Sequence, residues 1–157
     1  MTLHVTCDDI TTVYVDGINN ANLPNLKSWN QFASLELPET FKVIAIKCEN
    51  EFKRGGLQAK IEDTSGDIIL KTDETAKWLC SPVEENKWES VDFKPSQNWK
   101  APVVLSGKTA LGATGASWIW TEDPEVAEEM FCRVQGIGNV TDIALFFVVD
   151  NIGTQFE

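Results

Sequence analysis

Short segments of apolar or alternating residues, separated by turn-forming residues, follow one another along almost the whole chain of 157 residues. A period of two is typical of β-strands that bury one face. Pairs such as Asp16-Gly17 and Gly55-Gly56 stand between the segments and favour turns. We expect strands over residues 3–6, 12–15, 33–37, 42–48, 57–62, 67–70, 102–105, 117–121, 130–134 and 143–150. This spacing predicts an all-β fold, namely an antiparallel β-sandwich.

One segment departs from the strand pattern. Residues 124–129 predict a single helical turn, because Asp123 is a suitable N-cap and Pro124 fits the first helical position. No linker, repeat or low-complexity tract divides the chain, and its length is typical of one domain. We therefore expect a single β-sandwich domain over residues 1–157.

Charge and hydropathy exclude two classes of partner. The chain has 13 Lys and Arg against 24 Asp and Glu, a formal net charge of -11. The basic residues form no stripe for phosphate contacts, so we expect no nucleic-acid partner. No apolar run approaches the roughly 20 residues that a membrane helix needs, so we also expect no membrane insertion. The chain begins in strand-like sequence without a signal peptide.

The four cysteines lie at positions 7, 48, 80 and 132. They have no C-x-x-C spacing, so zinc or thioredoxin-like chemistry is not indicated. They are compatible with two disulfides in any of three pairings, and equally with buried free thiols, and the sequence leaves both alternatives open. A glycosylation sequon at Asn139 is compatible with secretion, and also with chance occurrence in a chain rich in Asn. We favour an extracellular or cell-surface location over a cytoplasmic one.

Tryptophan is the most informative residue type, with six in the chain. An indole buries a large area and needs one partner for its N–H group, which favours packing in a core or at a sheet end. Trp29 differs, because it lies in the polar loop 25–31 with no alternation around it. There, a platform for the apolar face of a sugar and a packing role are both compatible with the sequence. Packing is expected for Trp78, Trp88, Trp99, Trp118 and Trp120.

The chain contains, in this order, the segments TCDDITTVYVDG, FKVIAIKCENEFKRGGLQAKIED, KTDETAKW, FKPSQNWKAP and ASWIWT. This series, over residues 3–133, resembles the galactose-binding-like jelly-roll modules attached to bacterial α-L-rhamnosidases. In those modules a Trp-Ile-Trp segment precedes the strand with the acidic pair, whereas here it follows. The resemblance thus implies a circularly permuted or repeat-derived jelly roll in which residues 117–134 pair beside the N-terminal strand. The tail, residues 139–157, would add a strand or an oligomer contact.

Sugar-binding members of that family use calcium at the end of the sandwich to hold sugar hydroxyls. Calcium takes about six to eight oxygen ligands, and carboxylates, amides and hydroxyls all qualify. For the acidic pair, the alternative is an Asx-type turn or a solvated strand end. The resemblance implies calcium ligands at Asp8, Asp9, Glu49 and Asn50. It implies sugar contacts at Trp29, Asn50, Arg54 and Asp8, with Lys53 on the same rim.

A lectin-like protein that binds a saccharide with the help of calcium is therefore the function that the resemblance implies. Catalysis has little support, because the only histidine, His4, lies in an alternating strand where a structural role is expected. No serine elbow is present. Two alternatives stay open: a structural or protein-interaction domain without a sugar site, and a glycosidase accessory fragment. A weak single site would favour display on a homo-oligomer.

Overall fold

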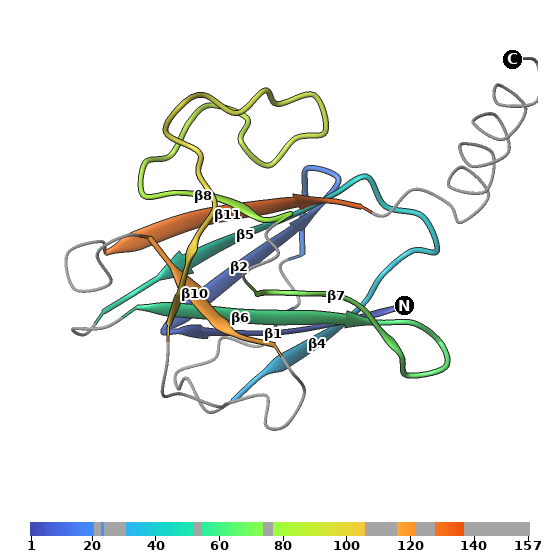
Figure 1. Cartoon of the computed structure of the whole chain (residues 1–157). Coiled ribbons are helices and arrows are strands. Elements are labelled where there is room, and N and C mark those ends of the chain that lie inside the picture. The colour runs from blue at the N-terminus through green and yellow to red at the C-terminus, as the bar shows by residue number, and fades with distance from the viewer. Residues whose placement is uncertain are drawn as a thin grey trace, which may run out of the picture.

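The computed structural model describes residues 1–20, 23, 31–51, 55–73, 77–105, 116–121 and 128–136. Within these residues the chain forms strands and connecting turns, and no helix is present. The strands are β1 (Thr2–Asp8), β2 (Ile10–Val15), β3 (Ile18–Asn19), β4 (Ala33–Glu36), β5 (Val43–Glu49), β6 (Gly56–Glu62), β7 (Ile68–Lys71), β8 (Leu79–Ser81), β9 (Val103–Leu105), β10 (Trp118–Trp120) and β11 (Glu129–Gln135). They lie in two layers (Figure 1).

Both layers are antiparallel sheets. Sheet A has the strand order β4-β1-β6-β10-β9, with β7 also paired to β6. Sheet B has the order β3-β2-β5-β11-β8. The predicted all-β class and antiparallel sandwich are therefore confirmed, whereas the jelly-roll connectivity stays a prediction.

The strands expected up to residue 134 are all present, and their ends differ from the expected ones by about two residues at most. β3 and β8 were not expected, because two or three residues are too few to show alternation. Residues 143–150 lie outside the described residues, as does most of the expected helical turn, whose last residue begins β11. In the described part of the chain, no helix is long and apolar enough to cross a membrane.

The expected pairing of residues 117–134 beside the N-terminal strand is wrong. β10 pairs with β6 and β9, and β11 pairs with β5 and β8. β6 separates β1 from β10 in sheet A, and β5 separates β2 from β11 in sheet B. A physical reason is that β5 and β6 are largely buried and central in their sheets, so their backbone groups need hydrogen-bond partners on both edges.

Alternation along the strands builds the core between the sheets. The odd-numbered residues of β1 and the even-numbered residues of β5 share one buried cluster. This is expected, because every second side chain of a strand points to the same face. Because each sheet contributes one apolar face, neither could remain folded in water without the other. The cluster includes Leu3, Val5, Cys7, Ile44, Ile46 and Cys48.

A second cluster lies on the opposite face of sheet B. The connection between β8 and β9 covers this face, as Figure 1 shows above β8 and β11. Its Trp88 packs edge-on against Phe131 of β11 and stacks on Trp99, with ring centroids 5.1 and 6.1 Å apart. Sheet B is therefore buried on both faces over these strands, which accounts for part of the tryptophan content.

Arg133 of β11 ties the same connection to the sheet. Its guanidinium donates hydrogen bonds to the carbonyl oxygens of Phe93 and Ser90, each at 3.1 Å, and lies 5.0 Å from the centre of the Phe93 ring. Burial lowers the pKa of Arg133, but an arginine keeps its charge in proteins. A buried cation here is stabilised by two carbonyl dipoles and an aromatic face.

The five tryptophans for which packing is expected are all buried, each at most 5% exposed. Two of them explain the Gly55-Gly56 pair, which the sequence alone marks as a turn. A Cβ atom on Gly56 would lie 2.7 Å from Cε3 of Trp118, and one on Gly55 would overlap the Trp120 ring. The two glycines therefore allow the indole rings of β10 to lie against the backbone of β6.

Gly56→Ala should lower the free energy of unfolding by about 1–3 kcal/mol, because the added methyl group forces the Trp118 ring or the backbone to shift. Urea unfolding measures the change. Trp118→Leu provides the matched background, in which Gly56→Ala should cost clearly less. Equal costs in the two backgrounds would show that Trp118 does not limit the space at this glycine.

His4 belongs to a polar row on the outer face of sheet A. Its Nδ1 lies 2.8 Å from Ser34 Oγ, and its Nε2 lies 3.2 Å from Glu62 Oε2. Lys60 donates to the other oxygen of Glu62 at 2.5 Å. These residues come from β4, β1 and β6, so the contacts link three neighbouring strands, as cross-strand pairs do.

The pKa of Glu62 is lowered, chiefly by the hydrogen bond from Lys60 and also by His4, against the opposing effect of burial. A lowered folded-state pKa contributes stability that is fully present above the ordinary carboxyl pKa and is lost as the pH falls through the lowered value. Glu62→Gln should therefore melt below the wild type at neutral pH, and the gap should narrow as the pH falls below the ordinary carboxyl pKa. The exposed Glu39→Gln is the control, and a gap that does not narrow with acid would contradict the prediction.

Candidate functional site

One end of the sandwich gathers the acidic residues that the sequence singles out. There β1 leaves sheet A, turns at Asp9 and continues as β2 in sheet B, while β5 ends and β11 begins beside it. In sheet B, Glu49 pairs with Ile10 on one side and with Glu129 on the other. We call this end the acidic rim. Its described members are Asp8, Asp9, Glu49, Asn50, Glu51, Glu128 and Glu129.

Asp9 connects the two sides of this corner. Its backbone N–H donates to the carbonyl oxygen of Glu49 at 2.7 Å. Its carboxylate Oδ2 accepts the backbone N–H of Glu51 at 2.8 Å. A carboxylate that accepts a backbone N–H acts as a cap for the end of a segment, so Asp9 has a structural role in addition to any role in binding.

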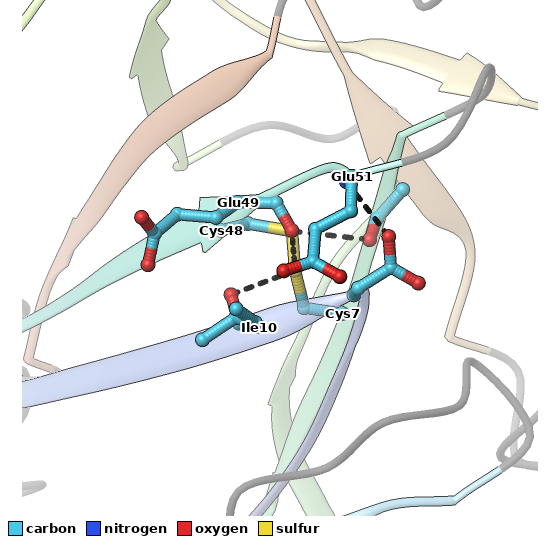
Figure 2. The surroundings of a disulfide bond; sticks show 7 residues. Cys7, Ile10, Cys48, Glu49 and Glu51 are labelled. Carbon is cyan, nitrogen blue, oxygen red and sulfur yellow. Dashed lines mark hydrogen bonds between the residues drawn. A yellow bond between two sulfur atoms is a disulfide. The ribbon is translucent and has the colours of Figure 1, made fainter.

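A disulfide lies beneath the corner (Figure 2). Cys7 of β1 is bonded to Cys48 of β5, with Cα atoms 5.8 Å apart, and the bond links sheet A to sheet B. The second disulfide, Cys80–Cys132, joins the neighbouring strands β8 and β11 within sheet B. Of the alternatives left open by the sequence, the structure thus contains two disulfides rather than free thiols.

Strands β5 and β11 hold the other members of the rim. The Asn50 N–H donates to the Glu128 carbonyl oxygen at 2.7 Å. Lys47 Nζ lies 3.3 Å from Glu49 Oε1 and 3.2 Å from Glu129 Oε1. Burial lowers the pKa of Lys47, but the hydrogen bond to Glu129 and the charge of Glu49 outweigh it, so the pKa of Lys47 is raised overall. The ammonium group is therefore held charged between two carboxylates.

Asp8 lies in a different environment from Asp9. It is the last residue of β1, pairs with Gly56 and is only 8% exposed. Thr6 and Gln58 form the neighbouring pair on the same two strands and are also buried. Asp9 lies outside β1, in the turn to β2, and its carboxylate accepts the Glu51 N–H, so adjacency in sequence does not by itself make the two aspartates a chelating pair.

The described part of the rim does not by itself fit calcium. Among the residues that the structure describes, no group of three or more His, Cys, Asp or Glu side chains is placed to hold a metal ion. Asp9 accepts the Glu51 N–H, and Glu49 is paired with Lys47. Calcium takes about six to eight oxygen ligands, so calcium binding at the rim stays a prediction.

The predicted sugar contacts divide into two groups. Asp8 and Asn50 lie at this end of the sandwich, where β1 and β5 finish. Trp29, Arg54 and the neighbouring Lys53 lie outside the described residues. Their roles therefore remain those that the resemblance implies.

Sequence reasoning missed four residues of this site. Glu51 directly follows Asn50 and could have been included with it. Glu128, Glu129 and Lys47 gave no comparable signal, because their contacts depend on the pairing of β11 with β5. Such a pairing joins residues far apart in the chain, and local patterns do not report it.

Comparisons with protein families, with curated proteins and with solved structures find no match for this chain. The class that the structure defines is that of an antiparallel β-sandwich with two disulfides and an acidic rim at one end. The resemblance to rhamnosidase-associated modules stays a prediction.

Asp9→Ala tests the calcium prediction. If Asp9 is a ligand, calcium should raise the melting temperature of the wild type by mass action, and the variant should lose this rise. The variant should also lose about 1 kcal/mol of stability without calcium, because the Glu51 N–H loses its acceptor. Calorimetric titration with calcium and melting curves with and without chelator measure the two effects separately.

Asp92→Ala is the control for this experiment, since Asp92 is an exposed acidic residue on the connection between β8 and β9. It should keep the calcium-dependent rise. A wild type that shows no binding heat at millimolar calcium would exclude the metal from the site.

Proposed function

We propose that the chain is a lectin-like, non-catalytic protein that binds a saccharide at the acidic rim. The observation that supports this best is the arrangement of Asp9, Asn50 and Glu51. Each is a polar residue at the end of a strand, and the backbone N–H of each is hydrogen-bonded to another segment. Polar groups on loops that a rigid sandwich positions are a common location for binding sites.

Sugar hydroxyls donate hydrogen bonds, and the rim is rich in acceptors. A carboxylate offers two acceptor oxygens, and the amide of Asn50 both accepts and donates. Groups held in place before binding lose little freedom when a ligand arrives, which favours affinity. The charge of Lys47 is already shared by Glu49 and Glu129, so the described part of the rim disfavours anionic saccharides.

The resemblance supplies the remaining features of this proposal. Trp29 would stack on the apolar face of a pyranose, and Arg54 would donate to its hydroxyls. Calcium assistance is proposed on the resemblance alone. A shallow site of this kind is weak, and a homo-oligomer would add avidity without new contacts. The two disulfides support the proposed extracellular or cell-surface location, since such bonds persist in oxidising compartments.

A structural or protein-interaction domain without a sugar site is the second candidate. One observation favours it: the carboxylates of Asp9 and Glu49 already have partners within the fold. Groups that cap a segment or pair with a lysine are explained without any ligand. A glycosidase accessory fragment ranks third, because it rests on the resemblance only.

Glycan-array binding, with and without chelator, separates the first two candidates. The proposed function predicts binding to a restricted set of saccharides. A folded protein that binds no saccharide on the array would leave the structural or interaction role.

Trp29→Ala then tests the stacking residue. It should keep the wild-type melting temperature and lose binding to beads that carry the glycan found on the array. Trp118→Ala should instead lower the stability by about 3–5 kcal/mol, because Trp118 is only 1% exposed. Full binding by the Trp29 variant, or a loss of stability as large as that of the Trp118 variant, would identify Trp29 as a packing residue.

A further inference from the structure

We propose that the Cys7–Cys48 disulfide is the positioning element of the acidic rim and that binding at the rim depends on it. The claim that binding depends on the disulfide rests on the saccharide function proposed above. The claim that the disulfide positions the rim concerns only the fold. The bond joins the penultimate residue of β1 to the penultimate residue of β5 (Figure 2). Asp9 follows directly after the end of β1.

Three attachments follow one another along this corner. Cys7 is bonded to Cys48, the Asp9 N–H is hydrogen-bonded to the Glu49 carbonyl, and Ile10 pairs with Glu49 in sheet B. The chain between the first and last attachment is therefore fixed at both ends to consecutive residues of β5. A cross-linked segment this short has few accessible conformations. The disulfide thus limits the positions that the Asp9 carboxylate can occupy.

The two sulfur atoms also contact the other segments that meet here. Cys7 Sγ lies 3.3 Å from the Ile10 carbonyl oxygen, and Cys48 Sγ lies 3.3 Å from the Gly56 carbonyl oxygen. Both cysteines are fully buried. The bond is therefore in contact with the beginnings of β2 and β6 as well as the ends of β1 and β5.

The effect of the disulfide reaches Glu51 through Asp9. The Glu51 N–H depends on the Asp9 carboxylate for its hydrogen bond, 2.8 Å long. Figure 2 shows Glu51 beyond the end of β5. Hydrogen bonds at an exposed edge open readily when nothing else holds the segments. The covalent bond therefore determines whether the bonds at the corner form together.

The second disulfide provides a matched control. Cys80 and Cys132 are direct partners on adjacent strands of sheet B, and both lie in the core. The two bonds close loops of similar size, with sequence separations of 41 and 52 residues. Their loop-entropy contributions to stability should therefore be similar. Only Cys7–Cys48 joins the two sheets at the rim.

The experiment compares Cys7→Ala/Cys48→Ala with Cys80→Ala/Cys132→Ala by amide hydrogen exchange under native conditions. In the first variant the amides of Asp9 and Glu51 should exchange about tenfold faster than in the wild type, or more. In the second variant they should stay close to the wild type. The Asn50 amide is an internal reference, because its bond to Glu128 joins the segments just beyond the paired strands β5 and β11 and involves neither Asp9 nor a cysteine. It should change much less in the first variant.

A second variant, Cys7→Val/Cys48→Ala, replaces the volume of the sulfur atoms without the cross-link and serves if the alanine pair does not fold. Unchanged exchange at Asp9 and Glu51 in the variants that lack Cys7–Cys48 would overturn the proposal. An equal increase in the variants of both disulfides would overturn it as well, because it would reflect only a general loss of stability.

Binding is then measured on beads coated with galactose or rhamnose. The wild type and the Cys80/Cys132 variant should bind, and the Cys7/Cys48 variants should not. A Cys7/Cys48 variant that binds as well as the wild type would show that binding does not depend on this disulfide, while leaving the saccharide function intact. A wild type that binds neither sugar and no glycan on the array would refute the saccharide function. Hydrogen exchange would still test whether the disulfide positions Asp9 and Glu51.

Discussion

The requirement that two apolar sheet faces bury each other governs this molecule. Residues of β1 and β5 alternate so that each strand contributes one face to the common core. Where the chain crosses from one sheet to the other, backbone groups lose their partners in the ladder and need replacements. At Asp9 the backbone N–H donates to the Glu49 carbonyl oxygen, the side-chain carboxylate accepts the Glu51 N–H, and a disulfide joins Cys7 to Cys48 nearby. The candidate site is therefore a consequence of a crossing between sheets.

Burial of the second face of sheet B explains residues that a simple sandwich would not require. The connection between β8 and β9 brings Trp88 and Trp99 onto Phe131, and Arg133 binds two carbonyl oxygens of that connection. A strand that is buried on both faces no longer alternates between apolar and polar residues. This burial accounts for the apolar run Met130, Phe131 and Cys132 in β11. The rim remains an end of the sandwich where polar groups are accessible.

The sequence pointed to part of the site for a sound physical reason. Acidic residues at the ends of strands meet at the same edge when the strands become neighbours, and Asp9 and Glu49 do so. The pairing of Glu129 with Lys47 could not be anticipated, because it requires β11 to lie beside β5. Asp8 shows the opposite case, because it is adjacent to Asp9 in the sequence but lies in a different environment in the structure. It lies with the buried polar pair Thr6 and Gln58.

The sequence by itself determined the positions of most strands and the burial of five tryptophans, because a period of two and the size of an indole act locally. Only the tertiary structure decided which cysteines are bonded and where residues 117–134 pair. It also decided why positions 55 and 56 require glycine. Each of these depends on which strands lie side by side. That choice is made by the burial of whole sheet faces, whose contacts join residues far apart in the chain.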